Sequence, residues 1–87
     1  MYVILVYDVN VERLDKVRKF LRQRLTWVQN SVFEGELSEA QFERVRLGLK
    51  DIIDDAEDAV VVYQFSSLKW VNRTTLGVEK NPTENLF

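Results

Sequence analysis

Residues 2–8 read YVILVYD, and residues 59–65 read AVVVYQF. Both runs are short and rich in β-branched and aromatic residues, which is typical of strands that are buried on both faces within a sheet. Two shorter strand-like runs lie between them, at residues 26–29 (TWVQ) and 32–37 (VFEGEL). The two residues that separate these runs predict a tight connection or a kink.

Two amphipathic helices are predicted between these strands. Asn10 is a suitable N-cap for the first, which we expect over residues 11–25 because leucine and valine recur there at helical spacing. Ser38 and Gln41 have the spacing of a capping box and predict the start of the second helix. Leu47 lies nearly opposite the apolar face of that helix, where it is either a surface residue or part of a contact. The apolar face itself consists of Phe42, Val45, Leu49, Ile52 and Ile53.

The order of these elements is β-α-β-β-α-β, followed by a weak, short strand at residues 74–79. This is the split β-α-β arrangement of the ferredoxin-like fold, an α+β class in which an antiparallel sheet carries both helices on one face. We expect one domain over residues 1–87, of which residues 80–87 form a tail. The other sheet face is apolar, so a second copy is expected to cover it in a face-to-face homodimer. The short C-terminal strand would then add to the edge of the partner's sheet.

The 87-residue chain contains neither cysteine nor histidine. Thiolate metal sites, zinc fingers and nucleophiles activated by histidine are therefore excluded. No apolar run approaches the roughly 20 residues of a membrane span, and the N-terminus lacks the features of a signal peptide. These observations predict a cytoplasmic protein that has no membrane partner.

Charge is distributed unevenly, although the net charge is only −2. Residues 11–30 hold six basic and two acidic side chains. Such a basic helix permits one surface that faces the phosphates of a nucleic acid, and the alternative is a solvated helix face. The acidic run at residues 54–58 lacks the spacing of a calcium loop and is predicted to be a solvated loop. The basic residues assigned to the nucleic-acid surface are Arg13, Lys16, Lys19 and Arg22.

Asp8 is the candidate for chemistry, because it ends the first buried strand and core packing gives a carboxylate there little purpose. Two structural alternatives stay open: Asp8 caps the following helix, or it pairs with Arg13 or Lys16. One carboxylate can hold a hard cation such as Mg²⁺ together with waters and phosphate oxygens. In a two-fold dimer, two Asp8 side chains would share one cation, which would lower the pKa of a bound water and clamp a phosphodiester. Without histidine, metal-assisted hydrolysis is the only economical nuclease mechanism for this chain.

Two motifs carry a family resemblance. Tyr7-Asp8 closes the first strand, and residues 29–35 form a Q-x-S-V-F-x-G run. With the basic helix between them, these motifs resemble the small CRISPR-associated endoribonuclease family, the second of the two core spacer-acquisition proteins. The resemblance implies a ferredoxin-like homodimer with an exchanged C-terminal strand. It also implies that Asp8 is catalytic and binds Mg²⁺ across the dimer axis, with Tyr7 as a catalytic neighbour and with Ser31 and Phe33 near the site.

The same resemblance implies two functions. The first is a Mg²⁺-dependent endoribonuclease that acts on single-stranded RNA or, in some family members, on duplex DNA. The second is a non-catalytic scaffold that bridges dimers of the CRISPR adaptation integrase and holds duplex DNA by its backbone. Family members often carry an arginine where this chain has Trp27. A third class, a ligand-binding regulatory domain of the same fold, lacks a polar pocket motif in this sequence.

Overall fold

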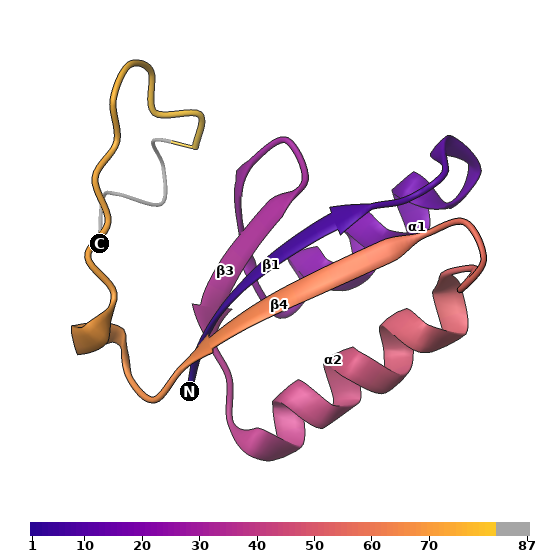
Figure 1. Ribbon diagram of the computed structural model, residues 1–87, viewed down its shortest axis with the longest axis horizontal. Coiled ribbons are helices and arrows are strands. Elements are labelled where there is room, and N and C mark those ends of the chain that lie inside the picture. Colours follow the sequence, from indigo (N-terminus) through magenta and orange to yellow (C-terminus); the bar gives the residue numbers. More distant parts are fainter. Residues whose placement is uncertain (82–87) are drawn as a thin grey trace.

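Residues 1–81 are described by the computed structural model, which has two layers, a four-stranded antiparallel sheet and two helices (Figure 1). The elements are β1 (Tyr2–Asp8), α1 (Val11–Arg22), β2 (Thr26–Gln29), β3 (Val32–Glu36), α2 (Glu39–Ile52), β4 (Ala59–Phe65) and a short 3₁₀ helix, η1 (Leu68–Trp70). The strand order is β2-β3-β1-β4, so the N-terminal strand lies inside the sheet. This confirms the predicted α+β, ferredoxin-like arrangement. Neither helix among these residues is long and apolar enough to cross a membrane.

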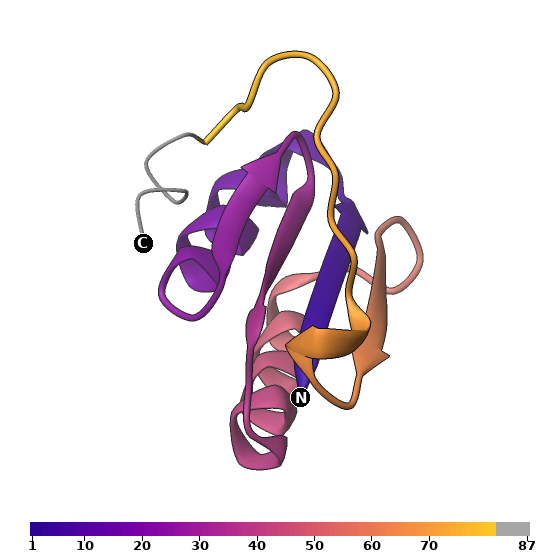
Figure 2. The same cartoon turned by 90° about the vertical axis from the view of Figure 1, so that its left-hand side faces the viewer.

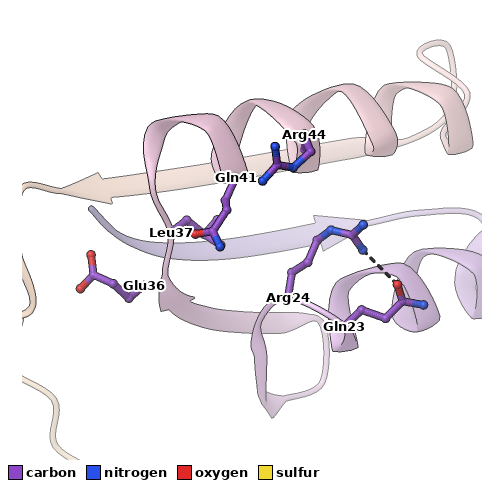
Figure 3. Close-up of a pocket in the computed structure, with 6 residues that line it drawn as sticks. All are labelled: Gln23, Arg24, Glu36, Leu37, Gln41 and Arg44. Carbon is purple, nitrogen blue, oxygen red and sulfur yellow. Dashed lines mark hydrogen bonds between the residues drawn. The ribbon is translucent and has the colours of Figure 1, made fainter.

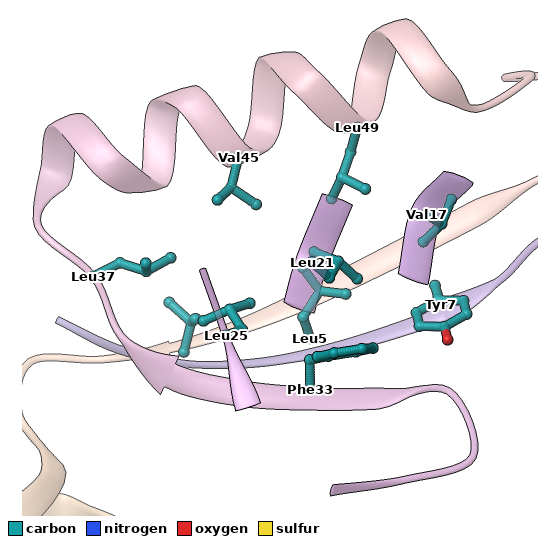
Figure 4. Close-up of a cluster of buried hydrophobic side chains, with 10 residues drawn as sticks. Leu5, Tyr7, Val17, Leu21, Leu25, Phe33, Leu37, Val45 and Leu49 are labelled. Atoms are coloured by element: carbon teal, nitrogen blue, oxygen red, sulfur yellow. The ribbon is translucent and has the colours of Figure 1, made fainter. Parts of the chain in front are cut away.

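The core lies between the sheet and the two helices (Figure 4). Because side chains alternate along a strand, every second residue of β1 points toward the helices. Leu5, at the centre of β1, lies opposite Phe33 on β3 and Val62 on β4. The buried residues that form the core are Val3, Leu5, Tyr7, Val17, Leu21, Leu25, Phe33, Leu37, Val45 and Leu49.

Both α-helices lie on one face of the sheet, and neither α1 nor α2 covers the other face (Figure 2). Val6, Val61 and Tyr63 project from it, with 37 %, 49 % and 56 % of their surface exposed. The strand register places Val6 opposite Val61 and Ile4 opposite Tyr63, so these four side chains form one apolar patch. We call this surface the open face. Its apolar patch is the surface that a second copy is predicted to cover.

The sequence signals for the helix starts are confirmed. The Asn10 side chain caps α1 by accepting a hydrogen bond from the Glu12 N–H. Ser38 and Gln41 form both hydrogen bonds of the capping box at the start of α2. The first helix is shorter than predicted, however, because α1 ends at Arg22 and the chain then turns. This turn carries Leu25 into the core, where it is 7 % exposed.

The strand predicted over residues 74–79 is not formed within a single chain, where residues 71–81 have no regular secondary structure, and its pairing with the sheet of a second copy stays a prediction. A strand needs the backbone of a neighbouring strand to pair with. Arg73 and Asn81 instead attach this segment to the sheet through their side chains, and Gly77 bends it with a φ of +86°. From residue 82 onward, the predicted tail lies outside the described residues.

Two glycines allow close approaches between elements. A Cβ atom at Gly35 would lie 3.0 Å from a methyl carbon of Leu25. A Cβ atom at Gly48 on α2 would lie 2.3 Å from the ring of Phe20 on α1. The two helices can therefore pack at this distance only because position 48 has no side chain.

Gly48→Ala is expected to lower the free energy of unfolding by about 1 kcal/mol. Alanine is favoured over glycine within a helix by about 1 kcal/mol, but overpacking costs about 1–3 kcal/mol. The Phe20 ring would have to leave its place beneath the Arg24 guanidinium, which lies 4.4 Å from the ring centre. Denaturant unfolding measures the effect.

A Phe20→Ala background is the control for this prediction. Without the ring, Gly48→Ala is expected to stabilise the protein by up to about 1 kcal/mol, the helix preference alone. An equal effect of the substitution in both backgrounds would contradict the proposed clash.

Candidate functional site at the end of β1

Asp8 is the last residue of β1, and its side chain is exposed on the open face. It lies opposite Ala59, the first residue of β4, whose methyl side chain offers the Asp8 carboxylate no hydrogen bond. The apolar patch follows directly, since Val6 is the next β1 residue on the same face. Asp8 is therefore a carboxylate at the margin of an apolar surface.

Both structural alternatives for Asp8 are excluded within residues 1–81. Asn10, not Asp8, caps α1. Arg13 forms its ion pairs with other acidic residues, and Lys16 has no ion-pair partner among the described residues. No hydrogen bond or ion pair in this part of the chain uses the Asp8 carboxylate.

A partly buried ion pair fixes the segment that follows Asp8. Arg13 Nε donates to Asp58 Oδ2 at 2.5 Å, and Arg13 Nη2 donates to Asp58 Oδ1 at 3.1 Å. Asp58 also accepts from the backbone N–H groups of Asn10 at 2.8 Å and Asp54 at 2.9 Å. We call Asn10, Arg13 and Asp58 the clasp. It ties the connection between β1 and α1 to the residue before β4.

The clasp corrects two predictions. The run at residues 54–58 was expected to be a solvated loop, but the Asp58 side chain has no exposed surface. The Arg13 guanidinium, assisted by two backbone N–H groups, holds the pKa of the Asp58 carboxyl well below its usual range. Arg13 was assigned to a nucleic-acid surface, but its guanidinium is occupied by Asp58 and by Glu57, whose Oε1 lies 2.8 Å from Nη2.

The remaining basic residues of that surface are on α1. Lys16, Lys19 and Arg22 are exposed, and none has a hydrogen bond or ion pair within the described residues. Two successive steps of three residues bring them along one side of the helix, away from Val17 and Leu21. Their positive charge is therefore available to a ligand.

Tyr7 and Phe33 lie on the helix side of the sheet, opposite to Asp8. Tyr7 is 3 % exposed, and its ring centre is 6.1 Å from that of Phe33. The Tyr7 hydroxyl is buried and has no hydrogen-bond partner among residues 1–81. Ser31 lies beside the end of β1, since its carbonyl accepts the Tyr7 N–H at 3.1 Å. The side chains of Tyr7 and Phe33 therefore point into the core, and Ser31 lies beside the end of β1.

The opposite end of β1 carries an ionic network that the sequence analysis missed. Glu34 pairs with Arg73 at 3.2 Å and lies beside Tyr2. Burial, followed by the charge of Glu34 and its hydrogen bond, raises the pKa of Tyr2 to about 12. The Tyr2 hydroxyl therefore stays protonated at neutral pH and does not serve as a base.

Trp27 has a structural role in the hairpin between β2 and β3. Its indole N–H donates to the carbonyl of Asn30 at 3.0 Å. Asn30 itself adopts a positive φ of 40° at the turn. The Trp27 carbonyl accepts from the Asn81 side chain at 2.7 Å, so this residue links the hairpin to the C-terminal segment.

The whole-chain comparisons decide the family. The family model described as CRISPR associated protein Cas2 matches residues 1–73. The chain belongs to the Cas2 family. It is 57 % identical to the CRISPR-associated endoribonuclease Cas2 of Pyrococcus furiosus and 56 % identical to that of Thermococcus kodakarensis, over 100 % of each chain. A crystal structure of Cas2 matches with a TM-score of 0.85 and 49 % identity, covering 94 % of this chain and 92 % of that one.

These matches confirm the resemblance drawn from the Tyr7-Asp8 pair and the run at residues 29–35. For this Cas2 family member, sequence reasoning missed the role of Asp58, which pairs with Arg13 and fixes the segment after Asp8. A signal for it exists, because antiparallel neighbours start and end at the same edge of a sheet. The acidic residue just before β4 therefore lies near the residues just after β1, among them Arg13.

Asp58→Asn is expected to lower the melting temperature at pH 7 by roughly 10 °C, since a partly buried ion pair loses one charge while Arg13 stays in place. The pH dependence has a defined sign. A carboxyl whose pKa is depressed by folding stabilises the protein above its unfolded pKa of about 3.9, and this stability is lost as the pH falls below that value. The substitution is expected to remove this part of the acid sensitivity.

Thermal unfolding between pH 7 and pH 2.5 tests both effects. Asp55→Asn is the matched control, because Asp55 is exposed in the same turn and has no hydrogen bond or ion pair within residues 1–81. Equal melting curves for the two variants across this range would show that the clasp does not stabilise the fold.

Proposed function

We propose that two copies of this chain pair through their open faces and that their two Asp8 carboxylates form a metal-dependent site that cleaves phosphodiester bonds in RNA. The observation that carries this proposal is the position of Asp8. It is an exposed carboxylate with no partner within residues 1–81, at the margin of an apolar sheet face. Curated relatives that are 46–57 % identical are named CRISPR-associated endoribonuclease Cas2, which supports RNA as the substrate.

The apolar patch supports the dimer. Val61 and Tyr63 on β4 and Val6 on β1 expose 37–56 % of their surface side by side. Large exposed apolar patches on small proteins commonly mark interaction surfaces. A two-fold axis that passes near the end of β1 brings the same residue of both copies together, so one Asp8 becomes two.

Asp8 of each chain would supply half of the carboxylate ligands of a shared magnesium site. Within residues 1–81, no group of three or more acidic side chains is placed to hold a metal. Mg²⁺ needs only one or two carboxylates, because it keeps several waters and takes phosphate oxygens from its substrate. Asp8 from each copy would hold the ion, which when bound lowers the pKa of a water and offsets phosphate charge.

The clasp and Ser31 would position this site. Because Asp58 anchors Asn10 and Arg13, the chain immediately after Asp8 is fixed against β4. The Tyr7–Ser31 backbone hydrogen bond fixes the other side of the same strand end. Tyr7 would support the site from the core, by packing against Phe33, and would not contact the substrate.

Asp8→Asn is expected to reduce RNA cleavage by at least about a hundredfold, since the substitution removes the charge that binds the cation. The measurement is cleavage of labelled single-stranded RNA and of duplex DNA by purified protein, with Mg²⁺ and with EDTA. The two substrates decide between ribonuclease and deoxyribonuclease activity. The mass of each variant in solution shows whether the dimer is intact.

Asp15→Asn is the matched control, because Asp15 is an exposed acidic residue on the following helix. Cleavage that is lost in Asp8→Asn and retained in Asp15→Asn supports the proposal. Cleavage that persists in Asp8→Asn, or that is insensitive to EDTA, contradicts it.

A second candidate function is a scaffold that binds duplex DNA by its backbone, and a specific observation favours it. Lys16, Lys19 and Arg22 are exposed and have no partner within the described residues. Contacts from such residues go to phosphates and carry no sequence information. In this function the segment from Lys80 onward docks the CRISPR adaptation integrase, and Asp8 lies at the dimer axis without cleaving the duplex.

Replacing Lys16, Lys19 or Arg22 by glutamine is expected to weaken duplex binding equally for all sequences. Each lost phosphate contact should lower the slope of log affinity against log salt by about 1. Titrations of labelled duplex DNA at several salt concentrations measure this slope. Lys50→Gln on α2 is the control and should leave it unchanged; an identical slope in all four variants would exclude α1 as the contact surface.

A further inference from the structure

A polar hollow of about 370 Å³ lies between the end of α1 and the start of α2 (Figure 3). Its volume is within the range of about 300–1,000 Å³ that is typical of small-molecule sites. Arg24 extends into it from the turn after α1, and Arg44 and Gln41 extend from α2 on the other side. The hollow is lined by Gln23, Arg24, Glu36, Leu37, Gln41 and Arg44.

The charge of this hollow is positive and unbalanced. Arg44 has no hydrogen bond or ion pair among residues 1–81. Arg24 donates only to the Phe20 carbonyl and the Gln23 amide oxygen in this part of the chain, and therefore has no carboxylate partner. Glu36 is the one acidic residue of the lining, and it pairs with the ammonium group of Met1 at 2.8 Å. Two guanidinium groups thus share one hollow without a counter-charge from its lining.

The two amide side chains leave donors, not acceptors, for a ligand. The Gln41 oxygen accepts the Ser38 N–H at 2.8 Å as part of the capping box. The Gln23 oxygen accepts from Arg24 Nη1 at 3.2 Å. Both oxygens are therefore already used, and both NH₂ groups are available. A lining of two guanidinium groups and two amide NH₂ groups suits a ligand that only accepts hydrogen bonds.

We propose that this hollow binds a phosphate monoester group, held by Arg24 and Arg44 and hydrogen-bonded by Gln23 and Gln41. A phosphate monoester carries a charge of about −1.5 to −2 at pH 7 and three strongly accepting oxygens, which matches two guanidinium groups and two amide NH₂ groups. The group can come from a free nucleotide or from the terminal phosphate of a nucleic-acid strand.

This site is separate from Asp8. Glu36 and Leu37 adjoin the first residues of β1, whereas Asp8 is its last residue. Six residues of a strand that rises about 3.3 Å per residue place the two sites about 20 Å apart along β1. Phosphate binding at the hollow therefore requires neither the metal nor the carboxylate of the proposed nuclease site, and the two proposals can fail independently.

Titration of the ¹⁵N-labelled protein with inorganic phosphate, without divalent metal, tests the proposal. We expect saturable shifts in the side-chain NH₂ signals of Gln23 and Gln41. Arg24→Gln and Arg44→Gln are each expected to weaken binding by about tenfold or more, the usual cost of one charged hydrogen-bonding group. Both arginines are exposed, so the variants should keep the fold, and unchanged backbone spectra would verify this.

Arg46→Gln is the matched control, because Arg46 lies two residues along the same helix and pairs with Glu43 away from the hollow. Equal phosphate affinity in wild type, Arg24→Gln and Arg44→Gln would overturn the proposal, as would an equal loss in Arg46→Gln. Asp8→Asn is expected to bind phosphate as wild type does.

Two further ligands identify the source of the phosphate group. If the hollow receives a strand end, single-stranded RNA with a 5′-phosphate should bind at least about tenfold more tightly than the same RNA with a 5′-hydroxyl, and Arg44→Gln should abolish the difference. If it receives a free nucleotide, AMP should shift the Gln23 and Gln41 signals while the two RNAs bind equally. Either result supports a phosphate site, and the absence of any shift with phosphate, AMP and phosphorylated RNA contradicts it.

Discussion

The alternation of side chains along β1 decides what each surface of this molecule can do. β1 is hydrogen-bonded to β3 and β4 on its two sides, so it cannot rotate to exchange its faces. Val3, Leu5 and Tyr7 are buried against the helices. Residues at even positions must then point to the open face. Asp8 shares one surface with Ile4 and Val6 because they share this parity, and the strand register adds Val61 and Tyr63 of β4 to the same surface.

The clasp shows how a small fold accommodates a buried charge. Taking a carboxylate out of water is costly unless its oxygens are fully paired. The two Asp58 oxygens accept from Arg13 and from the backbone of Asn10 and Asp54, and this pairing offsets the cost. The same bonds fix the segment between Asp8 and α1. The stability of the fold and the position of Asp8 therefore both depend on the clasp. The clasp also occupies the guanidinium of Arg13.

The sequence predicted those parts of the fold whose signals are local. Strong apolar runs gave β1 and β4 with their observed bounds, and the capping residues Asn10 and Ser38 gave the helix starts. The parts that were missed depend on tertiary neighbours. Residues 74–79 have strand-like composition but pair with no backbone within residues 1–81, and Asp58 looks like a surface acid until β1 and β4 are placed side by side.

The candidate site was predicted unevenly for the same reason. The position of Asp8 follows from the strand pattern alone, whereas the roles of its neighbours depend on which face each one occupies. Tyr7 is adjacent to Asp8 in sequence but points into the core, and Phe33 packs against it there. The motif at residues 29–35 thus contributes to the core as well as to the strand end.

The proposed dimer and the proposed cation depend on each other. Two carboxylates about 4 Å apart repel each other by about 4 kcal/mol at the effective dielectric constant of a protein surface. Covering the open face of two copies would bring the Asp8 side chains together at its margin, so apolar burial would be opposed by this repulsion. A shared divalent cation turns the repulsion into attraction and leaves coordination positions for water and phosphate. A carboxylate at the margin of an apolar patch opposes the burial of that patch when no cation is present. The same carboxylate is well placed when it forms one half of a shared metal site.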